Sequence, residues 1–134
     1  MNLKTNYLNS LLLAVIIVTP ILCHTQTTTR YGALAIDKSN GYYYGFSYDY
    51  TTLSEAQSKA ISECKAKGGN CALVLCWSGT GCGVYRTIEG DVGTAYGWGV
   101  AKTKAEADEI ATAECLQRSD GIPALNHVWS CNGL

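Results

Sequence analysis

The same series of short motifs occurs twice in the longer, C-terminal part of this chain. Each copy has a Tyr-Gly-aromatic triplet, then an alanine-rich segment that a threonine opens, then a cysteine. The two copies are Tyr44-Gly45-Phe46, Thr52 and Cys64, and, about fifty residues later, Tyr96-Gly97-Trp98, Thr103 and Cys115. Because the order is the same, each copy is expected to form one structural unit. We therefore expect residues 31–134 to be a single domain made of the halves 31–82 and 83–134.

The N-terminal region has the pattern of a secretory signal peptide. Lys4 precedes an uncharged apolar run at 11–18, and small or polar residues follow that run. The run is shorter than the about 20 residues that a transmembrane helix needs. We predict that residues 1–25 are a signal peptide and that the protein is secreted to an extracellular or periplasmic location. We predict no stable membrane insertion after the signal is removed.

Cysteine usage agrees with export, because six of the seven cysteines fall in the expected mature chain. An even number of cysteines in a short exported chain predicts a disulfide framework. The candidates are Cys64, Cys71, Cys76, Cys82, Cys115 and Cys131. No C-x-x-C pair occurs, and His127 is the only histidine after the signal, so we expect no metal site and no cofactor. The formal net charge of −1, without a basic run, does not favour a nucleic-acid partner.

Residue patterns predict the order β-β-α-β in each half. In the first half, strands at 31–36 and 42–50 precede a helix at 52–67, and an apolar strand follows at 71–77. Thr52 with Glu55 forms the capping-box pattern that starts a helix, and Thr103 with Glu106 repeats it.

The second half is expected to have strands at 83–88, 95–100 and 123–129 and a helix at 103–118. By spacing, Pro123 stands in place of Cys71, Val128 in place of Cys76, and Trp129 in place of Trp77. The predicted fold class is α+β: two pseudo-symmetric β-β-α-β halves that share an antiparallel-rich sheet, with both helices on one side and disulfide bonds as staples.

These motifs resemble domain of unknown function 4189, a group of small exported domains. The resemblance covers about residues 31 to 131 and rests on five features: the segment Gly32-Ala33-Leu34-Ala35, the two Tyr-Gly-aromatic triplets, and the two alanine-rich helices that end in Glu63-Cys64 and Glu114-Cys115. It implies a fold and an exported location but no reaction. The chain departs from the family pattern at Pro123, where a cysteine is usual, and at Cys76, which is an addition.

The disulfide pairing can be predicted in part. Cys64 and Cys71 are separated by a glycine loop, so we favour a bond between them. A Cys71–Cys76 bond is disfavoured, because an extended strand would hold their Cα atoms beyond the limit of about 7 Å. Cys82 and Cys131 follow the two tryptophans at corresponding places, so either they bond to each other or each bonds to the helix of its own half.

No recognisable catalytic constellation is present, and we predict that the protein is not an enzyme. His127 lies inside an apolar strand without a motif that pairs it with a nucleophile. Glu89 and Asp91 form a carboxylate pair of the kind that glycosidases use, but acidic residues are also common in solvated turns. A small hydrolase that uses Glu89 and Asp91, or His127, remains one alternative.

The main binding candidate is a strand with aromatic residues at every second position from Tyr42 to Tyr50. With a period of two, these rings would line one face, with Tyr42 and Tyr50 exposed and the middle rings packed. The candidate binding residues are Tyr42, Tyr44, Tyr48, Tyr50 and Trp98. We predict a non-catalytic module that binds an unknown protein or carbohydrate. The further alternative is an inhibitor or immunity-type protein that blocks a secreted hydrolase.

Overall fold

The computed structural model describes residues 28–88 and 95–133, and in both halves the order of elements is β-β-α-β. The first half has β1 (Tyr31–Asp37), β2 (Tyr44–Tyr50), α1 (Leu53–Ala66) and β3 (Cys71–Ser78). The second half has β4 (Cys82–Thr87), β5 (Tyr96–Ala101), α2 (Lys104–Arg118) and β6 (Asn126–Cys131). The predicted α+β class and the β-β-α-β halves are confirmed. Thr52 and Thr103 cap the two helices, as expected from the capping-box pattern.

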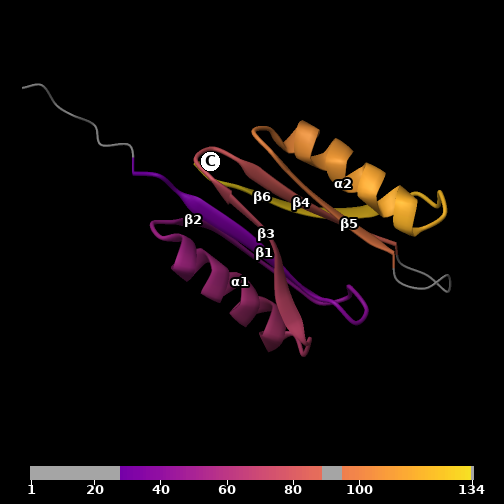
Figure 1. Cartoon of the computed structure of the whole chain (residues 1–134), viewed down its shortest axis with the longest axis horizontal. Coiled ribbons are helices and arrows are strands. Elements are labelled where there is room, and N and C mark those ends of the chain that lie inside the picture. The colour runs from indigo at the N-terminus through magenta and orange to yellow at the C-terminus, as the bar shows by residue number, and fades with distance from the viewer. Residues whose placement is uncertain (1–27, 89–94, 134) are drawn as a thin grey trace, which may run out of the picture.

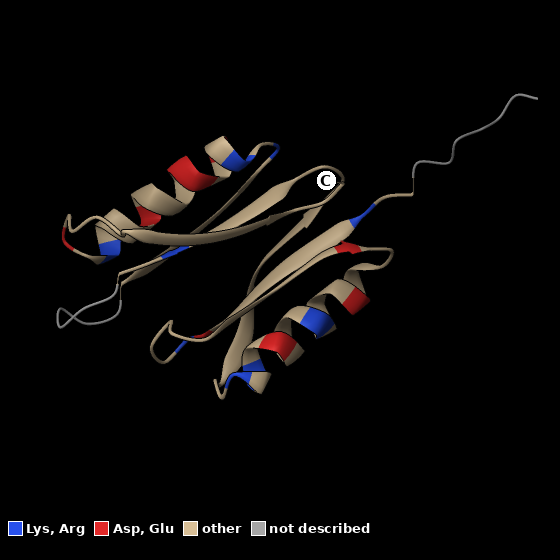
Figure 2. Cartoon of the chain, turned by 180° about the vertical axis from the view of Figure 1, so that it is seen from behind, with Lys and Arg blue, Asp and Glu red and all other residues tan. Residues whose placement is uncertain are grey.

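The arrangement of the sheets differs from the single shared sheet that we expected. Each half forms its own antiparallel three-stranded sheet, in the order β2-β1-β3 and β5-β4-β6. The two sheets lie between the helices, and α1 and α2 cover opposite outer sides of the molecule (Figure 1). Charged side chains lie mostly on the two helices and in the turns (Figure 2). The domain is therefore layered as helix, sheet, sheet, helix.

The helices pack closely on their sheets because both contact surfaces are made of small residues. In α1 the fully buried residues are Ala56, Ala60 and Cys64, and Gly45 of β2 lies beneath them. A Cβ atom on Gly45 would lie 2.2 Å from the backbone oxygen of Ala60. Gly97 of β5 lies in the same way beneath Ala111. The glycine of each Tyr-Gly-aromatic triplet thus provides the space for the helix backbone.

Large side chains fill the space between the two sheets. Leu34, Ile36, Trp77 and Tyr85 are buried there, and none is more than 5% exposed. The Trp77 ring lies over Gly32 of its own sheet and over Gly83 of the other sheet. Because β1 alternates small alanines on one face with Leu34 and Ile36 on the other, both of its faces are buried in different layers.

The strand registers correct the alignment of the halves that spacing suggested. Trp77 pairs with Gly32, but the residue that pairs with the equivalent Gly83 is Ser130, not Trp129. Trp129 pairs with Val84 and is therefore the counterpart of Cys76. The register of β1 and β3 also shifts by one residue between Leu34 and Ala35. A one-residue offset moves a side chain to the other face, so Trp77 is buried and Trp129 is 42% exposed.

A small hydrogen-bond cluster joins the end of β6 to the first half. The Asn132 side chain accepts from the backbone N–H of Asp49 at 2.9 Å and donates to the carbonyl of Arg30 at 3.1 Å. The Asp49 carboxylate accepts from the backbone N–H of Gly133 at 2.7 Å. Asn132 is only 2% exposed, so these bonds satisfy a buried amide and fix the end of the second half on the first.

Two disulfide bonds are present. Cys64 and Cys71 are bonded, which confirms the favoured pair, and Cys82 is bonded to Cys131, which selects one of the two arrangements left open. The prediction that all six cysteines form disulfides is wrong for Cys76 and Cys115, which carry no such bond. Cys115 occupies the helix position of Cys64, but no cysteine stands near the start of β6. Cys76 and Cys115 cannot join each other, because they pack in separate cores under different helices.

We expect the two thiols to react at different rates in the native protein. Cys76 is half-buried on an edge strand, whereas Cys115 is 1% exposed and its burial raises the pKa of its thiol. A raised pKa lowers the thiolate fraction, and burial blocks access, so iodoacetamide should label Cys76 first and Cys115 only after unfolding. Peptide mass spectrometry of unreduced samples measures both rates. Equal labelling of both thiols in the native state would contradict this placement.

Candidate functional site

The predicted aromatic face is interrupted near the end of β2. Asp49 has a φ of 59°, and the pairing with β1 jumps from Ala33–Ser47 to Tyr31–Tyr50. This irregularity turns Tyr50 to the other face of the sheet, where it packs against the α1 core. The expectation that Tyr50 is an exposed outer ring was therefore wrong, since Tyr50 is half-buried.

The remaining candidate rings divide between core and surface. Tyr44 packs between the sheets, and its ring centroid lies 5.6 Å from that of Tyr85. Trp98 packs in the same core and stacks on Tyr96 at 5.8 Å, with the Arg118 guanidinium 4.7 Å from its ring. Tyr42 and Tyr48 are 68% and 57% exposed. The five predicted residues thus do not form one binding surface.

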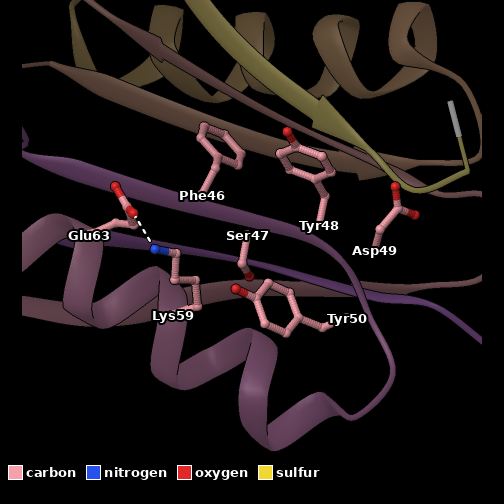
Figure 3. Close-up of a pocket in the computed structure, with 7 residues that line it drawn as sticks. All are labelled: Phe46, Ser47, Tyr48, Asp49, Tyr50, Lys59 and Glu63. Carbon is pink, nitrogen blue, oxygen red and sulfur yellow. Dashed lines mark ion pairs between the residues drawn. The ribbon is translucent and has the colours of Figure 1, made fainter.

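A groove lies along the free edge of β2 and contains two of the five candidates. Its volume is about 560 Å³, which is within the usual range for ligand sites of about 300–1,000 Å³. The lining residues are Phe46, Ser47, Tyr48, Asp49, Tyr50, Lys59 and Glu63. Phe46 and Tyr48 project from one face of β2, whereas Ser47 and Tyr50 project toward α1 (Figure 3). The groove therefore combines aromatic rings with charged groups from the helix.

Lys59 and Glu63 form an ion pair at the helical side of the groove, with 2.6 Å between Nζ and Oε1 (Figure 3). The hydrogen bond between them raises the pKa of Lys59 and lowers the pKa of Glu63, so both groups are charged at neutral pH. Their side chains are 47% and 43% exposed. An exposed pair of this kind contributes little to stability. Both groups can therefore exchange their mutual contact for contacts with a ligand.

The backbone of β2 is open beside the groove. The carbonyl of Tyr43 points toward β1, where it accepts a hydrogen bond from the backbone N–H of Asp37. Because backbone groups in antiparallel strands point alternately inward and outward, those of Phe46 and Tyr48 point away from β1. Lys67 covers the outward carbonyl of Tyr44 with a 2.6 Å hydrogen bond, and its ammonium lies 4.0 Å from the centroid of that ring. The open part of the edge is thus limited to the end of β2 that the groove borders.

The second sheet has a corresponding edge at β5, where the aromatic rings are covered. Arg118, in the last turn of α2, donates to the carbonyl of Tyr96 at 2.9 Å, as Lys67 does to Tyr44. Its guanidinium also covers the rings of Tyr96 and Trp98. The aromatic rings of β5 are therefore covered by their own helix, whereas Tyr48 is not.

The model of the family described as Domain of unknown function (DUF4189) matches residues 31–131, which is most of the sequence. This chain belongs to the DUF4189 family. Neither the curated proteins nor the solved structures include one that matches it. The DUF4189 match spans both halves and every lining residue of the β2 groove, but its description names no activity.

The alternative catalytic residues receive no support in this DUF4189 domain. Glu89 and Asp91 lie outside the described residues. His127 is exposed on β6, and Ser130 is buried; because they are three residues apart on one strand, their side chains point to opposite faces. Within residues 28–88 and 95–133, no group of three or more metal-ligating side chains gathers.

Sequence reasoning missed an ion pair next to His127. Arg86 of β4 binds both carboxylate oxygens of Asp108 on α2, at 2.8 and 2.7 Å, and also donates to the carbonyl of Ala124. This contact lowers the pKa of Asp108, and His127 lowers it further. Because each of the three guanidinium nitrogens donates a hydrogen bond, and these bonds join β4, α2 and the chain before β6, we assign the guanidinium a structural role.

Proposed function

We propose that the protein is an exported, non-catalytic binding module that holds an extended segment of a partner protein at the free edge of β2. The observation that carries this proposal is the aromatic groove beside an open strand edge, with Tyr48 57% exposed in it. An extended peptide can add a strand to such an edge, with backbone hydrogen bonds for affinity and side-chain pockets for specificity. A carbohydrate could stack on Tyr48 but would leave the backbone groups of Phe46 and Tyr48 unused.

The charged pair in the groove supports a polypeptide partner. Lys59 and Glu63 present one charge of each sign next to the aromatic rings. A peptide strand that pairs with Phe46 and Tyr48 would place alternate side chains over the rings and next to these charges. We expect the preferred segment to carry an apolar side chain, over the rings, directly next in sequence to a polar or charged one, which would face the helix.

Export and domain organisation belong to the same proposal. We propose that residues 1–25 are a signal peptide, and that residues 31–134 form one domain of two repeated halves. The two disulfide bonds support an oxidising compartment. The identical strand order of the two sheets supports a repeat. Within the described residues, no helix is long and apolar enough to cross a membrane.

A comparison of two exposed tyrosines tests the binding proposal. Peptides selected from a random phage-displayed library on the mature chain should bind at least about tenfold more weakly to the variant Tyr48→Ala. Tyr42→Ala is the matched control, because Tyr42 is equally large and 68% exposed but does not line the groove. Binding should also slow amide hydrogen exchange at Phe46 and Tyr48, whose N–H groups would become bonded. Fluorescence anisotropy with a labelled peptide measures the affinities.

Three results would contradict the proposal. Peptides that bind Tyr48→Ala as tightly as the native chain would place the contact elsewhere. Binding of neutral oligosaccharides at the groove, without binding of any peptide, would favour a carbohydrate ligand. The inhibitor alternative is a special case of protein binding, since it requires one tight partner that co-purifies from the native source. Hydrolysis of peptide or glycan substrates by the purified chain would overturn the non-catalytic assignment.

A further inference from the structure

A second pocket lies in the other half of the molecule, between the start of α2 and the end of β6. Its volume is about 380 Å³, and it shares no lining residue with the β2 groove. It is lined by Thr80, Cys82, Lys102, Thr103, Lys104, Trp129, Cys131, Asn132 and Gly133. The Cys82–Cys131 disulfide, the Trp129 ring and the two lysines are its principal features. Neither the fold nor the proposed protein-binding function accounts for this combination.

Trp129 carries a large aromatic ring that the packing of the core does not require. The side chain is 42% exposed, and its counterpart in the first half is the smaller Cys76. α2 lies over Gly97 and Gly99 of β5, while β6 is the opposite edge strand of that sheet, so Trp129 stays partly exposed with Lys104 over its ring. An exposed indole that lines a pocket is well suited to stack on a flat or ring-shaped ligand.

The charge of the pocket is uniformly positive. Lys104 places its ammonium 4.2 Å from the centroid of the Trp129 ring, and Lys102 is exposed on the same rim. Among the described lining residues there is no aspartate or glutamate. Two carboxylates near the start of α2 are already engaged: Glu106 accepts from the Thr103 backbone and hydroxyl in the capping box, and Asp108 is bound by Arg86. A ligand that enters this pocket therefore meets two cations and no acidic side chain in the lining, which favours a carboxylate.

The walls of the pocket are held in place before any ligand arrives. The Cys82–Cys131 bond joins β4 to the end of β6, and the capping box fixes the first turn of α2. Asn132 is held by Asp49 and Arg30 of the first half. A preformed site requires little ordering on binding, so a small contact area can give measurable affinity.

We propose that this pocket binds a saccharide ring that carries a carboxylate, as a uronic acid does. The C–H face of the pyranose stacks on the indole of Trp129 in place of the Lys104 ammonium, which leaves the ring and, together with Lys102, pairs with the carboxylate. An inorganic anion would use the lysines but not the ring, and a neutral sugar would use the ring but not the lysines. An acidic sugar uses both parts of the pocket.

Titration of the mature chain with trigalacturonic acid tests this site, with intrinsic tryptophan fluorescence and calorimetry as readouts. We expect saturable binding that is at least about tenfold tighter than that of neutral maltotriose, and that weakens as salt screens the lysines. Trp129→Ala and the double variant Lys102→Gln/Lys104→Gln should each lose about tenfold or more in affinity. Trp129→Phe, which keeps an aromatic ring, should retain most of it.

Controls separate this site from the groove and from general charge effects. Lys38→Gln removes an exposed lysine of a distant turn and should leave the affinity unchanged, as should Tyr48→Ala. Monomeric galacturonic acid should compete at the same site if one ring is recognised. The proposal is overturned by the absence of saturable trigalacturonate binding at millimolar concentration, by equal affinity for maltotriose, or by full binding to Trp129→Ala. Tighter binding of hexaglutamate than of trigalacturonate would assign the pocket to an acidic peptide instead.

Discussion

Replacement of Trp77 by alanine should destabilise the domain by about 3–5 kcal/mol, the usual cost of removing a buried aromatic ring. Trp77 is 5% exposed and lies over Gly32 and Gly83, so it fills the junction of the two sheets. A loss of this size is a large part of the total stability of a typical domain, about 5–15 kcal/mol. Chemical denaturation followed by circular dichroism measures the change.

Trp129→Ala is the matched control for this prediction. The same side chain is removed, but Trp129 is 42% exposed, so the loss should be no more than about 1 kcal/mol. The stability loss for Trp77→Phe should lie between the losses for the two alanine variants. This variant keeps a ring and removes an indole N–H that has no hydrogen-bond partner among the described residues. Similar losses for Trp77→Ala and Trp129→Ala would show that the tryptophans are equivalent, as the sequence spacing suggested and the strand register contradicts.

Local signals in the sequence were sufficient for the elements and for one disulfide bond. The capping pairs at Thr52 and Thr103 act within one helical turn, and the Cys64–Cys71 bond closes a loop of 7 residues. The alanine-rich character of both helices was also visible in the sequence. These features depend on neighbours in the chain, so they could be predicted without knowledge of the tertiary structure.

The sequence-based predictions were wrong where a single backbone irregularity changes the face of the sheet from which a side chain projects. Asp49 adopts a left-handed conformation in the middle of an otherwise regular pattern, and this turns Tyr50 away from the face of Phe46. The register shift between β1 and β3, which lies between Leu34 and Ala35, likewise turns Trp77 to the other face of its strand. Irregularities of this kind leave little trace in the pattern of apolar residues, because each changes the register by only one position.

The β2 groove could be predicted only in part. Tyr48 was identified by its place in the aromatic series, but Lys59 and Glu63 were not, since their position depends on how α1 lies on the sheet. The alternation of residue sizes in β1 does indicate the two-sheet architecture. In β1, small Ala33 and Ala35 alternate with large Leu34 and Ile36, as expected of a strand with a helix on one face and a second sheet on the other.

Loss of the Cys82–Cys131 bond should cost more stability than loss of the Cys64–Cys71 bond, although both are single covalent links. The chain-entropy model relates the stabilisation to the length of the closed loop. The two sequence separations are 49 and 7 residues. The model then gives about 4 kcal/mol for Cys82–Cys131 and about 2 kcal/mol for Cys64–Cys71.

The positions of the two bonds increase this difference. Cys82 begins β4 and Cys131 ends β6, so their bond encloses the whole second half and holds its end beside the Asn132 cluster. The Cys64–Cys71 bond closes only the loop between α1 and β3. Double alanine variants, Cys82→Ala/Cys131→Ala and Cys64→Ala/Cys71→Ala, avoid a new free thiol and allow denaturation curves to be compared directly. Equal losses, or a larger loss for the short loop, would mean that the second half is held to the first without its covalent closure.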